Sequence, residues 1–175
     1  MKYLIFFFPC IFFAANSAFA LELRSPAFGA KGEIPYIHTC QDSQDLSLPL
    51  TWSDVPLGTR SFAIIMEERT GSITRVHWVI YDIPASMRQL NPGIARTRRL
   101  PNQILQGTND FSIDGYSGPC PKDTVAHHYY ITLYALDTAN LLNVNDVRKE
   151  NLVSAMRGHI IAEYQLVGRY TRIRQ

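Results

Sequence analysis

Three apolar-rich runs dominate the pattern of hydrophobic and polar positions along this chain. They are Ser61–Met66 (SFAIIM), Val76–Ile83 (VHWVIYDI) and His127–Leu136 (HHYYITLYAL). Runs of this length, rich in β-branched and aromatic residues, predict strands, and the first two are apolar enough to be buried on both faces. We therefore expect three central strands.

Shorter apolar segments predict further strands at Leu21–Arg24, Leu50–Trp52 and Ile160–Arg169. The first ends at Ser25-Pro26, and because proline removes a donor from the hydrogen-bonding ladder, we place this strand at a sheet edge. Two polar stretches separate the strands. Glu67–Arg75 is expected to be a loop and Ala85–Gln106 an extended surface connection.

One helix is expected near the end of the chain, at Asn145–Arg157. Asn145 is a suitable N-cap, and Gly158 is a natural stop just beyond the last turn. Several strands followed by one late helix predict a mostly β fold, namely an antiparallel two-sheet sandwich with a C-terminal helix on its flank. The length of 175 residues fits one domain.

The first twenty residues have the pattern of a secretory signal peptide. Lys2 precedes the apolar run Tyr3–Ala15, and Ala18-Phe19-Ala20 has the small-residue pattern of a cleavage site. An uncleaved membrane anchor is the alternative, but the run is shorter than the ~20 residues that a spanning helix needs. We expect a signal peptide at residues 1–20, a mature domain at residues 21–175, and a periplasmic or secreted protein.

The chain has a low net charge and therefore no strong overall electrostatic field. The formal charge is +2, and it falls to +1 when Lys2 is removed with the signal peptide. Nucleic acid and anionic membrane surfaces are therefore not expected partners. Arg96, Arg98 and Arg99 form one local basic cluster, which is more typical of a solvated loop than of a nucleic-acid patch.

Three cysteines are present, and Cys10 lies within the expected signal peptide. The two that remain, Cys40 and Cys120, suggest one disulfide in an exported protein. Two separate buried thiols are the alternative, because sequence alone does not show that the two residues are close in space.

The histidines are the main candidates for chemistry, since no nucleophile elbow, phosphate-binding loop, dinucleotide fingerprint or zinc-spaced cysteine set is present. His127 and His128 are adjacent on a strand, so their side chains point to opposite faces. The face of His127 is the more apolar, and we expect His127 to point inward and His128 toward solvent. His77 lies in an apolar strand, where a histidine is more often a hydrogen-bonded core residue than a ligand.

Six sequence blocks in order resemble those of one family. They are LELRSPAF with GEIPYIHTC, SLPLTWSDVPLGTRSFAI, VHWVIYDIP, GTNDF with GYSGPCP, HHYYITLYALD, and AMRGHIIAEYQLVGRY. The chain thereby resembles the phosphatidylethanolamine-binding protein family, in its bacterial Raf-kinase-inhibitor-like branch, from about Leu21 to Tyr170. Each block alone is weak, but six in order are specific.

The resemblance implies a two-sheet β fold with a small anion-binding pocket that accepts phosphate-like groups. The ligand-binding residues that it implies are Glu68, Thr70, His77, Gly118, Pro119, His127 and Tyr129. Imidazoles and loop amides can donate hydrogen bonds to phosphate oxygens, and a tyrosine can add a wall and a hydroxyl. The resemblance also supports a pairing of Cys40 with Cys120.

The chain departs from the family at the acidic loop of the pocket. Glu68 stands where the first of two aspartates is expected and keeps a carboxylate on a longer arm, whereas Thr70 replaces the second. Arg69 replaces a proline and is a further candidate for contact with an anion. His128 replaces an arginine.

We therefore predict an exported, non-catalytic binding protein with a pocket for a small phosphorylated or anionic ligand, and no cofactor. The first alternative is a protein-interaction or inhibitor module, similar to kinase or protease inhibitors, with a degenerate pocket. The second is an enzyme with zinc held by His77, His127 and Glu68. A protein partner and a homodimer are compatible with the sequence, whereas stable membrane insertion after signal cleavage is not expected.

Overall fold

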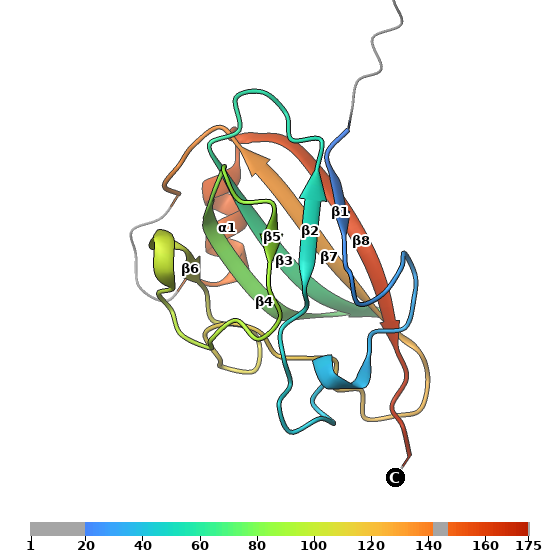
Figure 1. Cartoon of the computed structure of the whole chain (residues 1–175). Coiled ribbons are helices and arrows are strands. Elements are labelled where there is room, and N and C mark those ends of the chain that lie inside the picture. The colour runs from blue at the N-terminus through green and yellow to red at the C-terminus, as the bar shows by residue number, and fades with distance from the viewer. Residues whose placement is uncertain (1–19, 142–146, 175) are drawn as a thin grey trace, which may run out of the picture.

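The computed structural model in Figure 1 describes residues 20–141 and 147–174. The predicted signal peptide at residues 1–20 therefore lies, except for Ala20, outside the described residues and stays a prediction. The elements are β1 (Glu22–Arg24), η1 (Tyr36–His38), β2 (Leu50–Ser53), β3 (Ser61–Thr70), β4 (Ile73–Pro84), β5 (Gln89–Leu90), η2 (Pro101–Gln103), β6 (Leu105–Gln106), β7 (His127–Leu136), α1 (Lys149–Met156) and β8 (Ile160–Tyr170).

The strands form two antiparallel sheets, which confirms the predicted fold class. The smaller sheet has the order β1-β2-β5, and the larger has the order β6-β4-β3-β7-β8. Figure 1 shows the short strands β1, β2 and β5 lying over the long strands, with α1 to one side. β1 is an edge strand, as its proline boundary predicts.

The larger sheet is buried on both faces. One core lies between the two sheets and includes Leu23 and Trp52 of the smaller sheet and Phe62 of the larger. The other core lies under α1 and includes Leu152 and Met156. This second core explains why the central strands have continuous apolar sequences rather than alternating ones.

β3 sends its side chains alternately to these two cores. Phe62, Ile64 and Met66 belong to the core between the sheets, whereas Ala63 and Ile65 belong to the core under α1. The next residues of β3 continue this alternation beyond the apolar part of the strand. Glu68 thus shares a face with Met66, and Glu67 shares the face of the helix.

The predicted loop at Glu67–Arg75 is wrong. β3 continues to Thr70 and β4 begins at Ile73, so only Gly71 and Ser72 form the turn. Gly71 has a φ of 58°, a conformation that glycine adopts without steric cost. The hairpin extends past the apolar cores, so its residues are polar although they are paired, and a polar sequence resembles a loop.

The predicted start of the helix is also wrong. Asn145 lies outside the described residues, and α1 begins only at Lys149, after an extended Arg148 whose amide donates to the Asn151 side chain (3.0 Å). Val147 lies before the helix, and its carbonyl accepts a hydrogen bond from the Thr108 amide (2.8 Å). The predicted stop is confirmed, because Gly158 follows the C-cap with a φ of 81°.

The expected surface connection at Ala85–Gln106 contains the short elements β5, η2 and β6. The disulfide between Cys40 and Cys120 is confirmed, with 5.4 Å between the Cα atoms, and it joins the segment after η1 to the loop before β7. Among the described residues, no helix is both long and apolar enough to cross a membrane.

Candidate functional site

His77 reaches the site through a bulge in β4. The pairing of β3 with β4 passes from Met66–Trp78 to Glu67–Val76 and leaves His77 as the extra residue. An extra residue of this kind redirects a side chain out of the regular alternation. The His77 side chain is fully buried, and its Nδ1 donates to the carbonyl of Ser117 (2.7 Å). Its ring lies against Phe111 and Tyr129, with centroids 4.9 and 5.3 Å away.

His127 is the first residue of β7 and lies on the same face as the buried Tyr129 and Ile131. Its side chain is only 10% exposed, whereas His128 is exposed. The prediction that His127 points inward and His128 toward solvent is thus confirmed.

Glu68 lies between the two histidines. One carboxylate oxygen, Oε1, is 2.5 Å from His127 Nδ1, and the other, Oε2, is 3.4 Å from His77 Nε2. The hydroxyl of Thr70, two residues further along the same face of β3, donates to Glu68 Oε1 (3.1 Å). The longer arm of glutamate therefore places one carboxylate in contact with both imidazoles.

Asp123 is a site residue that the sequence did not identify. Its Oδ1 accepts a hydrogen bond from His127 Nε2 (3.1 Å), so His127 is held between two carboxylates. The loop before β7 carries Asp123, and a hydrogen bond from the Val125 amide (3.0 Å) fixes that carboxylate. Its spacing of four residues from His127 is a weak signal in a loop, because the approach depends on how the loop folds back.

The charges of this cluster shift the pKa of its members. Hydrogen bonding from His77, with a further contribution from His127, lowers the pKa of Glu68 to about 2, although burial opposes the shift. Burial lowers the pKa of His127, but the hydrogen bonds to Glu68 and Asp123 outweigh it and raise this pKa above its usual value. At neutral pH Glu68 is therefore a carboxylate.

An open pocket of about 190 Å³ lies over this cluster. Its lining residues come from the β3–β4 hairpin, the loop before β7 and the start of β7, and they are Glu68, Thr70, Ile73, Arg75, Pro121, Lys122, Asp123 and His127. Within the described part of the chain, the exposed side chains of Arg75 and Lys122 have no hydrogen-bond or ion-pair partner. The sequence prediction named neither of these two cations.

Two of the predicted site residues, His77 and Tyr129, lie behind the pocket rather than in its lining. Tyr129 is wholly buried, and burial raises the pKa of its hydroxyl. This hydroxyl faces the backbone of Cys120 and makes no hydrogen bond of ordinary geometry with any described residue. Tyr129 therefore supports the His77 ring, while its hydroxyl is a buried polar group without a firm partner.

Gly118 and Pro119 form a buried support and do not line the pocket. The amide of Gly118 donates to Asp45 Oδ1 (3.0 Å), so it is not available as the backbone donor that we expected for a ligand. The Pro119 carbonyl accepts a hydrogen bond from the Cys40 amide (3.2 Å). Asp45 is in turn paired with Arg96 (2.5 Å), so the Asp45–Arg96 pair fixes this part of the loop on the side away from the pocket.

Arg69 does not contact the pocket. It lies on the helix side of the sheet, where it pairs with Glu67 (3.0 Å) and covers the ring of Tyr130 with its guanidinium 4.5 Å from the ring centroid. Glu67 also pairs with Lys149 of α1. This group joins the helix to the sheet.

No group of three or more His, Cys, Asp or Glu side chains is arranged to hold a metal ion in residues 20–141 and 147–174.

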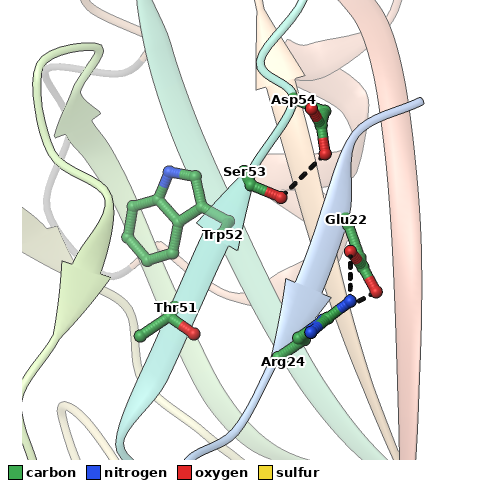
Figure 2. A pocket seen from close by; sticks show the side chains of 6 residues that line it. All are labelled: Glu22, Arg24, Thr51, Trp52, Ser53 and Asp54. Carbon is green, nitrogen blue, oxygen red and sulfur yellow. Dashed lines mark hydrogen bonds and ion pairs between the residues drawn. The ribbon is translucent and has the colours of Figure 1, made fainter. Parts of the chain in front are cut away.

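A second depression, of about 400 Å³, lies on the smaller sheet and is lined by Glu22, Arg24, Thr51, Trp52, Ser53 and Asp54. Figure 2 shows that its polar side chains bond to one another, Arg24 to Glu22 (2.8 Å) and Ser53 to Asp54 (2.9 Å). It contains none of the predicted site residues.

The two-sheet fold and this histidine–carboxylate pocket define a class of small β-sandwich proteins with a shallow polar site. The sequence profile of the family described as "Phosphatidylethanolamine-binding protein" matches residues 24–171. The chain belongs to the phosphatidylethanolamine-binding protein family.

Several relatives are known from sequence or from solved structures. A protein of Methanothermobacter thermautotrophicus is 39% identical over 153 residues, which cover 87% of this chain and 99% of the relative, and it is described only as a UPF0098 protein. A crystal structure of a Chlamydia trachomatis protein, described as a phosphatidylethanolamine-binding protein homologue, is similar with a TM-score of 0.78 and 35% identity, and covers 89% of this chain and 99% of that one. The E. coli protein YbcL, described as a new member of the mammalian family, also has a TM-score of 0.78, with 28% identity and coverage of 87% and 99%.

Proposed function

We propose that the protein is an exported, non-catalytic binding protein that accepts a small anionic group, foremost a phosphoryl group, in the pocket over Glu68 and His127. The observation that carries the proposal is the surplus of donors around this pocket. Arg75 and Lys122 line it and have no hydrogen-bond or ion-pair partner among the described residues. Thr70 and His127 also line the pocket, but their donors are engaged by Glu68 and Asp123. Two unpartnered cationic side chains that line one depression favour a phosphate or carboxylate.

The printed names of the relatives support the choice of a phosphoryl group. The family and the Chlamydia trachomatis protein are named for phosphatidylethanolamine, whose headgroup is a phosphate ester that also carries an amine. In the pocket, Arg75 and Lys122 suit the phosphate, whereas Asp123 suits the amine. Phosphoethanolamine is accordingly the first probe to use.

Export is supported by two independent features. The N-terminal sequence has the pattern of a signal peptide, and the Cys40–Cys120 disulfide belongs to oxidising compartments. The proposed location is the periplasm or the extracellular medium.

A protein-interaction or inhibitor module is the second candidate, and exposed apolar side chains beside the pocket favour it. Ile73, which lines the pocket, is 60% exposed, and Val125, in the loop before His127, is 65% exposed. Apolar side chains at the rim of a polar pocket suit contact with a protein as well as with a small molecule.

The proposal is tested by the histidine NMR signals of the folded protein during titration with phosphoethanolamine and with inorganic phosphate. We expect the His127 signals to shift with saturation, and His159, which pairs with Asp137 away from the pocket, to stay unchanged. Absence of a shift at millimolar ligand removes the small-anion function. A protein partner recovered from the native compartment, with binding that persists in His127→Ala, then favours the second candidate.

A further inference from the structure

Glu68 occupies the imidazole nitrogens that a bound anion would use. Its two oxygens contact His127 Nδ1 at 2.5 Å and His77 Nε2 at 3.4 Å. The remaining nitrogens are also engaged, since His77 Nδ1 donates to the carbonyl of Ser117 and His127 Nε2 bonds to Asp123. Each of the four ring nitrogens therefore already faces an oxygen of the protein.

Glu68 also lies on the path from the pocket to His77. Glu68 lines the open pocket, whereas His77 is fully buried and is absent from its lining. A ligand that enters the pocket meets the Glu68 carboxylate before it can meet the His77 ring. Thr70 holds this carboxylate in place through its hydroxyl (3.1 Å).

The length of the side chain makes this arrangement possible. Glu68 points to the face that carries Met66 and His127, and it lies directly opposite Tyr129 in the β3–β7 register. A carboxylate on an arm one methylene shorter would be drawn back toward β3 and would leave room between the two imidazoles. Glu68 thus has the negative charge of the expected ligand, and its side chain is long enough to place that charge between the two imidazoles.

We propose that Glu68 is a built-in occupant of the anion position and determines how strongly external anions bind. A phosphoryl group binds to Arg75 and Lys122 at the mouth of the pocket while Glu68 is in place, and it reaches the imidazoles only when Glu68 is displaced. This inference rests on the proposed function of the pocket as an anion site, because it concerns the competition for that site.

Two substitutions test the charge of Glu68 and the length of its side chain separately. Glu68→Gln keeps the length and removes the charge, whereas Glu68→Asp keeps the charge and shortens the arm. We expect Glu68→Gln to raise the affinity for inorganic phosphate tenfold or more and Glu68→Asp to raise it by a smaller factor, because like charges next to one another oppose binding. The measurement is made at about pH 6, where a histidine of ordinary pKa (~6.5) is still largely protonated without Glu68.

The matched control is Glu67→Gln, which neutralises the neighbouring carboxylate on the helix face of β3, away from the pocket. Calorimetric titration with inorganic phosphate is run on the disulfide-bonded wild type and on the three variants, each shown by thermal unfolding to be folded. An increase confined to the two Glu68 variants supports the inference.

The contrary outcomes are distinct from one another. Equal affinity in wild type and both Glu68 variants, or weaker binding in these variants, overturns the role of Glu68 and leaves the anion site standing. If none of the four proteins binds phosphate, the proposed function fails, and the inference fails with it.

Discussion

Glu67 and Glu68 are neighbours on β3, yet their carboxylates lie on opposite faces of the five-stranded sheet. Glu67 pairs with Lys149 of α1 and with Arg69, whereas Glu68 pairs with His77 and His127. Both carboxylates are buried, with 5% and 6% of the residue exposed. The alternation of one strand thus separates a group that holds the helix from a group that forms the pocket.

The Glu67–Lys149 pair is expected to contribute to stability. Glu67→Gln leaves the Lys149 ammonium without its main partner, and we expect the free energy of unfolding to fall by about 1–3 kcal/mol. Urea denaturation of the two single variants, Glu67→Gln and Lys149→Gln, and of the double variant measures the coupling. A coupling energy of zero would show that the pair does not hold α1 to the sheet.

The folded protein is expected to become less stable as the pH rises through the pKa of His127. This pKa is raised in the folded state, so the stabilisation is fully present below the usual histidine pKa of ~6.5 and is lost as the pH rises through the folded value. An NMR titration of His127 should give a pKa above ~6.5, and Asp123→Asn should lower it. A His127 pKa at or below the usual value contradicts the two-carboxylate arrangement.

The disulfide should account for a large part of the stability. It closes a loop with a sequence separation of 80 residues, for which the chain-entropy model gives about 4–5 kcal/mol when the native geometry is unstrained. Denaturation of the Cys40→Ala/Cys120→Ala variant, compared with wild type with and without reductant, measures the contribution of the disulfide to the free energy of unfolding. A difference below about 1 kcal/mol would mean that the loops around the pocket are held by their other contacts.

Gly118 should not tolerate a side chain. A Cβ there would lie 2.2 Å from Asp45 Oδ1 and 2.5 Å from the His38 carbonyl, so Gly118→Ala is expected to cost about 1–3 kcal/mol or more through overpacking. Gly29→Ala is the matched control, because a Cβ at Gly29 meets nothing within 4 Å. Equal stability of the two variants in thermal unfolding would refute the close packing behind the pocket.

The central strands could be predicted because burial on both faces leaves a continuous apolar run. β7 begins and ends where the sequence indicates, at His127 and Leu136. The Glu67–Arg75 hairpin was missed because it lies beyond both apolar cores and its paired residues are almost all polar, including the buried Glu67 and Glu68. Hydrophobic periodicity reports the burial of apolar side chains, so it does not detect strands that continue with polar residues.

The site was predictable only in part, for a similar reason. Strand alternation placed His127 inward, and the family pattern brought Glu68, Thr70 and His77 together. The roles of Asp123 and Lys122 depend on how the loop before β7 folds back over the sheet, which no periodic pattern encodes. The engagement of the Gly118 amide by Asp45 joins residues far apart in the sequence and required the structure.

The central claim is that the depression over Glu68 and His127 is an anion site. A crystal structure of the protein soaked with phosphoethanolamine tests it most directly. We expect a phosphoryl group in the pocket, in contact with Arg75 and Lys122 and near the Thr70 hydroxyl. An empty pocket at millimolar phosphoethanolamine, or a phosphoryl group bound only elsewhere on the surface, would contradict it.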